Sequence, residues 1–205
     1  MRDICAVVAI SLFLFPLVAA QDEVPKPKVS SDPLTAEQIA VYRAVLEDYM
    51  KGSDGALNLA NQTEPLKRAS LDRVCMKGIV LEADRDSVQI VRFLNPAVLI
   101  NSRIVLVDSD RQQERIKEND PQKLLKRAID DHEEVTDKEL EDSVKRAFET
   151  GLFSFSEIVF DKQHHHAVVV YSFVCGGLCG NGDTLVLTKV GQKWKVSKRC
   201  GGWIS

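Results

Sequence analysis

The fold is decided by HAVVVYSFVCGGLCGNGDTLVLTKV, residues 166 to 190. Two runs rich in valine, threonine and aromatic residues, 167–174 and 184–190, flank a segment with four glycines. Short apolar runs divided by a turn signal are typical of antiparallel strands joined in a hairpin. The first run is apolar at nearly every position, so we expect it to lie inside a sheet with both faces covered.

The glycine-rich segment CGGLCGNGD, residues 175–183, is compatible with a redox dithiol, a metal clip, a phosphate-binding loop or a stapled turn. A phosphate loop needs a helix N-terminus aimed at the anion, but an apolar run follows instead. A thioredoxin-like site uses Cys-x-x-Cys at a helix start, whereas Cys175 and Cys179 are one residue further apart. We therefore interpret the segment as a hairpin connection, with Asn181 and Gly182 as the left-handed residues of a tight turn.

Two neighbouring segments extend the hairpin to a meander of about four strands. They are FSEIVFD, residues 155–161, and KWKVSKR, residues 193–199. In the second, Trp194 and Val196 alternate with lysine, serine and arginine, which predicts one buried face and one solvent face.

The N-terminal half contains one clear helix. TAEQIAVYRAVLEDYMKG, residues 35–52, has apolar side chains at helical spacing and a glycine as its stop. GALNLANQT, from residue 55, and VCMKGIVLEA, from residue 74, are interpreted as short strands or irregular segments, and SVQIVRFLN, from residue 87, as a short helix. IVLVDSD, from residue 104, is predicted to be a strand that ends at a helix cap.

Residues 109–151 are densely charged and predict amphipathic helices. Asp120 and Pro121 form a cap and a first helical residue, and Thr136 with Glu139 forms a capping box. The following helix is expected to pack through one apolar face and to end at Gly151. The apolar residues of that face are Leu140, Val144, Ala147 and Phe148.

The N-terminus predicts export. Residues 1–20 combine Arg2, a short apolar block and a small-residue site ending at Ala20, as in a signal peptide cleaved there. The mature protein is thus expected to be secreted or periplasmic, without a membrane span. Residues 21–33 read as a flexible leader that buries nothing, and 34–205 as a single globular domain. The formal charge of −3 gives no basic face, so we expect no nucleic-acid partner.

Four cysteines remain after cleavage, and an even number in an exported chain predicts two disulfides. One pattern joins Cys175 to Cys179 and Cys75 to Cys200; the other joins Cys200 to Cys175 or Cys179. In the chain-entropy estimate the short bridge stabilises the fold by about 2 kcal/mol, and a bridge from Cys75 to Cys200 by about 5 kcal/mol. The first would shape a loop and the second would hold the fold together.

Two clusters of side chains are weak candidates for a metal site. His164 and His166 lie on one face of a strand if that strand begins at His164, and His165 lies on the other. They cannot share a metal with the cysteines if the strand runs straight, because about 33 Å of strand separates them. Asp130 and Glu134 are one helical turn apart, but we interpret them, like the histidine run, as solvated surface.

The last 50 or so residues resemble the C-terminal part of a family of uncharacterised exported bacterial proteins. The resemblance rests on a motif of the form C-G-G-L-C-G-x-G, then G-K-W-x-V, then W-[IV]-S, carried here by 175–182, Trp194 with Val196, and 203–205. Upstream only the order of helices is similar. The resemblance implies export and internal pairing of Cys175 with Cys179, since Cys75 and Cys200 fall outside the motif. It implies no activity.

Together these features predict an α+β domain in which a C-terminal antiparallel sheet packs on the N-terminal and middle helices. The curved, cone-like sheet of nuclear-transport-factor-like folds is one form it could take. The hydrolase signatures G-x-S-x-G and H-E-x-x-H are absent from the sequence. We therefore favour a non-enzymatic exported protein, without a cofactor, that binds a protein or small ligand or has a structural role in the cell envelope. The alternative is a thiol or metal-dependent enzyme that uses Cys175 and Cys179.

Overall fold

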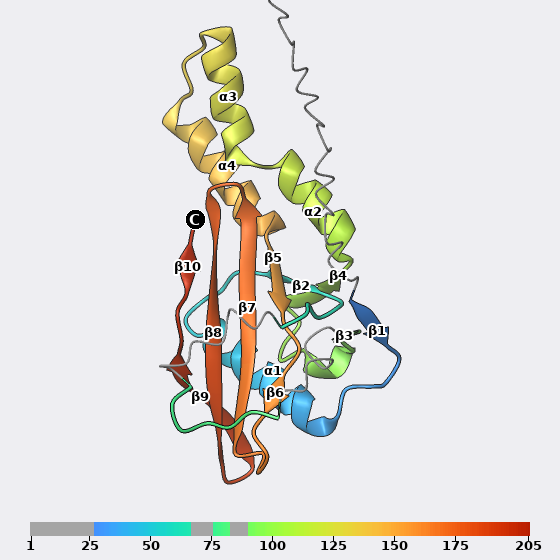
Figure 1. The fold of residues 1–205 in the computed structure, drawn as a ribbon. Helices are drawn as coiled ribbons and strands as arrows, with labels where there is room; N and C mark the ends of the chain where they lie inside the picture. Colours follow the sequence, from blue (N-terminus) through green and yellow to red (C-terminus); the bar gives the residue numbers. More distant parts are fainter. Residues whose placement is uncertain (1–26, 67–75, 83–89) are drawn as a thin grey trace, which may run out of the picture.

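A computed structural model describes residues 27–66, 76–82 and 90–205. The predicted signal peptide lies outside the described residues, as does Cys75. The helices all precede the six C-terminal strands β5 to β10, and together the elements build an open sheet with helices packed on it, which confirms the α+β class (Figure 1). No helix in the described part of the chain is long and apolar enough to cross a membrane.

The predicted C-terminal meander is confirmed as the centre of the sheet. The hairpin of β7 and β8 is its longest unit, and β9 continues it along the lower part of β8, antiparallel as expected (Figure 1). β5 and β6 pair with the other edge of β7, so the apolar run 167–174 is interior to the sheet, as predicted. The bounds are β5 Leu152–Phe155, β6 Val159–Phe160, β7 His166–Gly176, β8 Cys179–Val190 and β9 Lys193–Arg199.

The sheet also gains strands at both edges that the sequence did not place there. Parallel strands β2 (Leu57–Ala60) and β4 (Ile104–Val107) extend it beyond β5, and β10 (Trp203–Ile204) pairs with the upper part of β8. Among the described residues the main sheet therefore has eight strands, in the order β10-β8-β7-β5-β2-β4 with β6 and β9 alongside. Parallel pairing needs long crossover connections, and no local sequence pattern reports which distant strands will meet.

A separate pair of strands corrects two predictions. β1 (Lys28–Ser30) and β3 (Ile90–Arg92) form a parallel ladder, so 87–95 is not a short helix where it is described, and the leader is not wholly unstructured. The ladder is held by backbone pairing more than by burial, because Val29 stays 52% exposed while Val91 is buried. An amphipathic pattern cannot reveal a strand that is held in this way.

Helix α1 (Ala36–Tyr49) covers the lower part of one face of the sheet. Thr35 and Gln38 make the capping box that starts it, and Val41, Tyr42, Val45 and Leu46 are fully buried. The Tyr42 hydroxyl donates to the carbonyl of Ser156 at 3.0 Å, and burial raises the pKa of this tyrosine well above its ordinary value. This bond ties α1 to the chain between β5 and β6.

The opposite face of the sheet is covered by a short irregular segment. Val168 and Val186 are fully buried there against Cys200, with Met76, Ile79 and Leu81 packed over them. The segment 76–82 is thus an irregular packing segment, one of the two forms predicted for it.

The charged middle of the chain folds as three helices, of which α3 and α4 extend past the hairpin end of the sheet (Figure 1). The predicted starts are confirmed: Asp120 caps α3 with Pro121 in its first turn, and Thr136 with Glu139 forms the capping box of α4. α4 ends at Gly151, as expected. The bounds are α2 Ser109–Glu118, α3 Pro121–Asp131 and α4 Asp137–Thr150, and a short 3-10 helix, η3, spans Pro96–Val98.

Candidate binding groove

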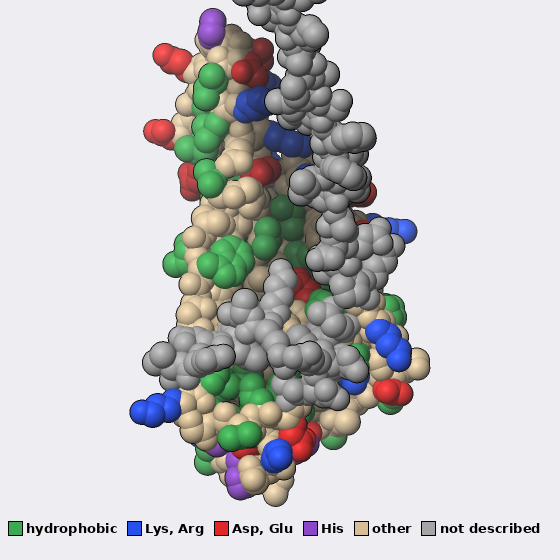
Figure 2. Space-filling model, in the orientation of Figure 1, with side chains coloured by type: hydrophobic (Ala, Val, Ile, Leu, Met, Phe, Trp, Pro, Cys, Tyr) green, Lys and Arg blue, Asp and Glu red, His purple; other side chains and the backbone are tan. Residues whose placement is uncertain are grey.

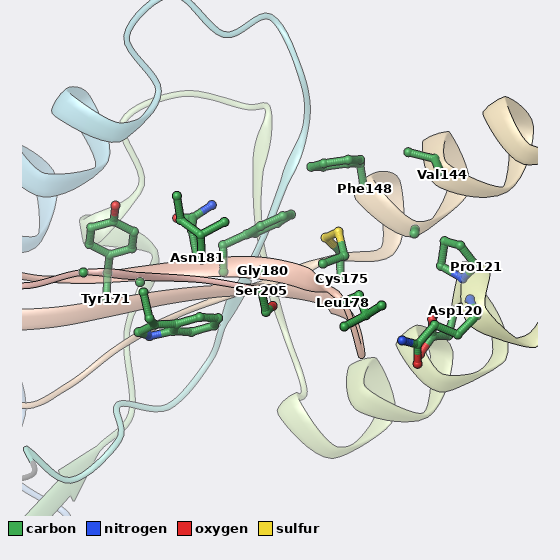
Figure 3. A pocket seen from close by; sticks show the side chains of 18 of the residues that line it. Asp120, Pro121, Val144, Phe148, Tyr171, Cys175, Leu178, Gly180, Asn181 and Ser205 are labelled. Atoms are coloured by element: carbon green, nitrogen blue, oxygen red, sulfur yellow. Dashed lines mark hydrogen bonds between the residues drawn. A yellow bond between two sulfur atoms is a disulfide. The ribbon is translucent and has the colours of Figure 1, made fainter.

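A groove of about 850 Å³ lies between helices α3 and α4, the hairpin tip of β7 and β8, and strand β10 (Figure 3). Its volume falls in the range of sites that hold small molecules, roughly 300–1,000 Å³. α1 covers the lower part of the same face of the sheet, so the groove occupies the part that α1 leaves free.

The hairpin tip is fixed to α3 by one carboxylate. Asp120 Oδ1 accepts from the backbone N–H of Gln122 at 3.0 Å and caps the helix, while Oδ2 accepts from the N–H of Gly177 at 2.9 Å. Gly151 joins α4 to β5 closely: a Cβ there would overlap the ring of Phe173, so glycine is required.

The walls of the groove are apolar, and their side chains are partly exposed to solvent. On α3 and α4, Leu125 is 43% exposed, Leu140 and Val144 are each 37% exposed, and Phe148 is 55% exposed (Figure 3). We expected this face of α4 to pack into the core. That prediction holds for Ala147, which is fully buried. The other side chains lie along the groove, because the helices reach beyond the end of the sheet that would have covered them (Figure 2).

Aromatic residues form the floor. Phe148 stacks on Phe173 with ring centroids 6.1 Å apart, and Tyr49 packs edge-on to Tyr171 at 5.4 Å. Burial raises the pKa of Tyr49, although a hydrogen bond with Asn181 opposes the shift. Asn181 therefore faces the groove and α1 from inside strand β8.

The position of Asn181 corrects the predicted turn. The hairpin turns at Gly177 and Leu178, whereas Asn181 and Gly182 pair with Phe173 and Ser172 as ordinary strand residues. Gly182 is needed for a different reason: the indole of Trp203 lies over it, and a Cβ there would be 2.8 Å from both Trp203 Cε2 and the Tyr171 carbonyl oxygen. Close approach by a side chain and a left-handed turn both favour glycine, so sequence alone does not separate them.

The predicted bridge between Cys175 and Cys179 is confirmed. The Cα atoms are 5.1 Å apart, and the bond closes the two-residue turn. Cys200 is also disulfide-bonded. Because Cys175 and Cys179 pair with each other, the competing pattern that joins Cys200 to either of them is excluded. The predicted partner of Cys200, Cys75, lies outside the described residues.

The geometry of this disulfide favours a structural role. Cys175 is fully buried, which shields its sulfur from the thiol of a large substrate. It forms part of the groove wall beside Phe173 (Figure 3).

His164 and His166 each contact a different carboxylate. His164 lies in a turn with φ of 54°, where its ring stacks on Phe160 and its Nδ1 is 2.7 Å from Glu37 Oε2. His166, the first residue of β7, places Nδ1 3.0 Å from Asp161 Oδ2. The expectation that His164 and His166 share one strand face is therefore wrong, because the strand begins only at His166.

No group of three or more potential metal ligands occurs within the described ranges. Asp130 to Glu134, the other weak candidate, is exposed at the end of α3, as predicted. His132 there adopts a left-handed conformation and closes the helix.

One end of the groove is polar, and no sequence pattern predicts it. Asp183 lines it, and its Oδ2 is 3.6 Å from Arg199 Nη1. Arg199 also forms an ion pair with Asp48 of α1. Burial acts to lower the pKa of Arg199, but the nearby Asp48, Tyr171 and Asp183 outweigh it and raise the pKa above its ordinary value. No local pattern marked Asp183, since its surroundings come from three distant segments.

Comparison of the chain with protein-family models, with curated proteins and with solved structures finds no match. The resemblance of residues 156–205 to exported bacterial proteins stays a prediction.

Proposed function

We propose that this protein is an exported, non-enzymatic binding protein whose groove holds the apolar part of a ligand. The observation that carries the proposal is the half-exposed apolar wall of α3 and α4 facing the hairpin tip across about 850 Å³.

Such a wall is costly for a protein to leave open to water. Leu125, Val144 and Phe148 form one continuous apolar surface with Phe173 and the hairpin tip. Covering apolar surface contributes about 25 cal/mol per Å². Grooves with this lining and a few polar groups at one end are typical of ligand sites.

The disulfides support the export part of the proposal. Bonds such as Cys175–Cys179 persist in oxidising compartments and are rare in the cytosol. The predicted cleavage after Ala20 and a secreted or periplasmic location agree with this chemistry.

Binding of a neutral apolar dye tests the proposal. N-phenyl-1-naphthylamine, which brightens in apolar surroundings, should bind the mature protein with saturation, and Phe148→Ala should weaken it. Phe93→Ala is the matched control, because Phe93 is 59% exposed, close to the 55% of Phe148, but does not line the groove. Equal loss of dye binding in both variants, or no saturable binding by the parent, would contradict the proposal. Thermal melting of each variant checks that it is folded.

A further inference from the structure

The charges along the groove are of one sign. Among the described residues that line it, the charged side chains are Asp120 and Asp183; no lysine, arginine or histidine is present. A groove with this lining disfavours an anionic ligand such as a fatty acid and favours a cationic one.

The two carboxylates differ in what they already bind. Both oxygens of Asp120 accept backbone hydrogen bonds, from Gln122 and Gly177. Asp183 is only 13% exposed, and its Oδ1 is buried without a hydrogen-bond partner in the part of the chain that the structure describes. The protein therefore leaves part of the hydrogen-bonding capacity of this carboxylate unfilled.

The negative charge of Asp183 is only partly compensated by Arg199. Arg199 Nη1 is 3.6 Å from Asp183 Oδ2, and the same guanidinium forms a closer ion pair with Asp48. Two carboxylates therefore share one guanidinium, which leaves one net negative charge at this end of the groove. Tyr171, which also lines the groove, accepts a hydrogen bond from Arg199 Nη1 through its hydroxyl at 3.5 Å.

We propose that the groove binds an amphiphile made of an apolar chain and a protonated amine. The chain lies along α3 and α4, against the half-exposed ring of Phe148. The amine forms an ion pair with the Asp183 carboxylate at the polar end. This inference rests on the proposed function and adds the chemical class of the ligand.

Competition with the neutral dye tests the ligand class. Decylamine, decanol and decanoate share one apolar chain and differ only in the head group, and near pH 7 the amine is protonated. Decylamine should displace the dye at the lowest concentration and decanoate at the highest. Decanoate competing as well as decylamine would overturn the proposal.

Variants at Asp183 and Arg199 test the position of the amine. Asp183→Asn should weaken the binding of decylamine by about tenfold or more, as expected for loss of an interaction between charged groups, and leave the binding of decanol and of the dye unchanged. Asp110→Asn, an exposed carboxylate on α2 outside the groove, is the matched control. Arg199→Gln should strengthen decylamine binding, because it removes the competing cation. A gain in affinity cannot arise from unfolding, so this variant remains decisive if Asp183→Asn is unstable.

The outcomes separate the two proposals. If the dye does not bind, the proposed function fails. If the dye binds but Asp183→Asn leaves the preference for decylamine intact, only the ligand class fails. If light scattering shows a dimer that Phe148→Ala dissociates, a second copy of the chain fills the groove and the amphiphile is overturned.

Discussion

Replacing Gly182 with alanine tests how β10 is held on the sheet. The new Cβ would lie 2.8 Å from Trp203 Cε2 and from the Tyr171 carbonyl oxygen, closer than side-chain carbons approach other atoms. β10 pairs with β8 through only two residues, so the indole and its strand should yield before the long β7–β8 ladder does.

The expected cost follows from what β10 gives up. Trp203 is 44% exposed, so detaching it uncovers about 120 Å² of a side chain of roughly 220 Å². At about 25 cal/mol per Å² this is about 3 kcal/mol. Strain from overpacking, if the strand stays, costs about 1–3 kcal/mol. Gly182→Ala should therefore lower the free energy of unfolding by about 2–3 kcal/mol.

Urea unfolding and tryptophan emission measure the effect. The emission of Gly182→Ala should shift to longer wavelength as Trp203 becomes wetter, while Trp194, which is buried, keeps its environment. Gly55→Ala is the control, since a Cβ there meets only Ser53 Oγ at 3.6 Å. In a Trp203→Ala background the cost of Gly182→Ala should fall by at least about 1 kcal/mol. Unchanged stability and emission in Gly182→Ala would refute the contact.

Two further perturbations test the disulfides and the ion pairs. Replacing Cys175 and Cys179 together by alanine should cost about 2 kcal/mol of stability, and Cys200→Ala should cost more if its bridge closes a much longer loop; urea unfolding of both variants would expose the reverse order. Burial acts to raise the pKa of Glu37, but hydrogen bonds from Lys189 and His164 outweigh it and hold this pKa below its ordinary value. Burial likewise acts to raise the pKa of Asp161, and hydrogen bonds from His166 and His165 outweigh it and lower this pKa. The stability that these carboxylates contribute is therefore present above about pH 4 and lost as the pH falls through their folded-state pKa values. Melting temperatures measured through that window should fall less steeply in Glu37→Gln than in the parent, and parallel curves would contradict the assignment.

Much of the fold could be predicted because its signals are local. Thr35 with Gln38 and Thr136 with Glu139 begin helices because each pair satisfies free backbone N–H groups within one turn. The apolar run of β7 and the alternation of Trp194 with lysines in β9 report burial directly. Where burial was slight, as in β1 and β3, the same reasoning failed.

The groove could be predicted only in part. Phe148 and Leu140 were recognised as an apolar helix face, but the sequence did not show that the sheet ends before it covers them. The sequence does not single out Asp183 as a site residue, because its surroundings include Arg199 and Asp48, which come from other segments. Gly182 was assigned to a turn, since the residue that requires it, Trp203, is 21 positions away in the sequence.

The sequence by itself determined the capped helices and the strands of the central hairpin, because each follows from contacts within a few residues, and it named the pairing candidates for the cysteines. Tertiary structure alone decided that CGGLCGNGD turns at Gly177 and Leu178 and that its later residues line a groove. Among the described residues it also decided which carboxylate oxygen, Asp183 Oδ1, is buried without a hydrogen-bond partner. The physical reason is that burial and charge at a point in space sum over segments far apart in the chain, and a linear pattern does not record that sum.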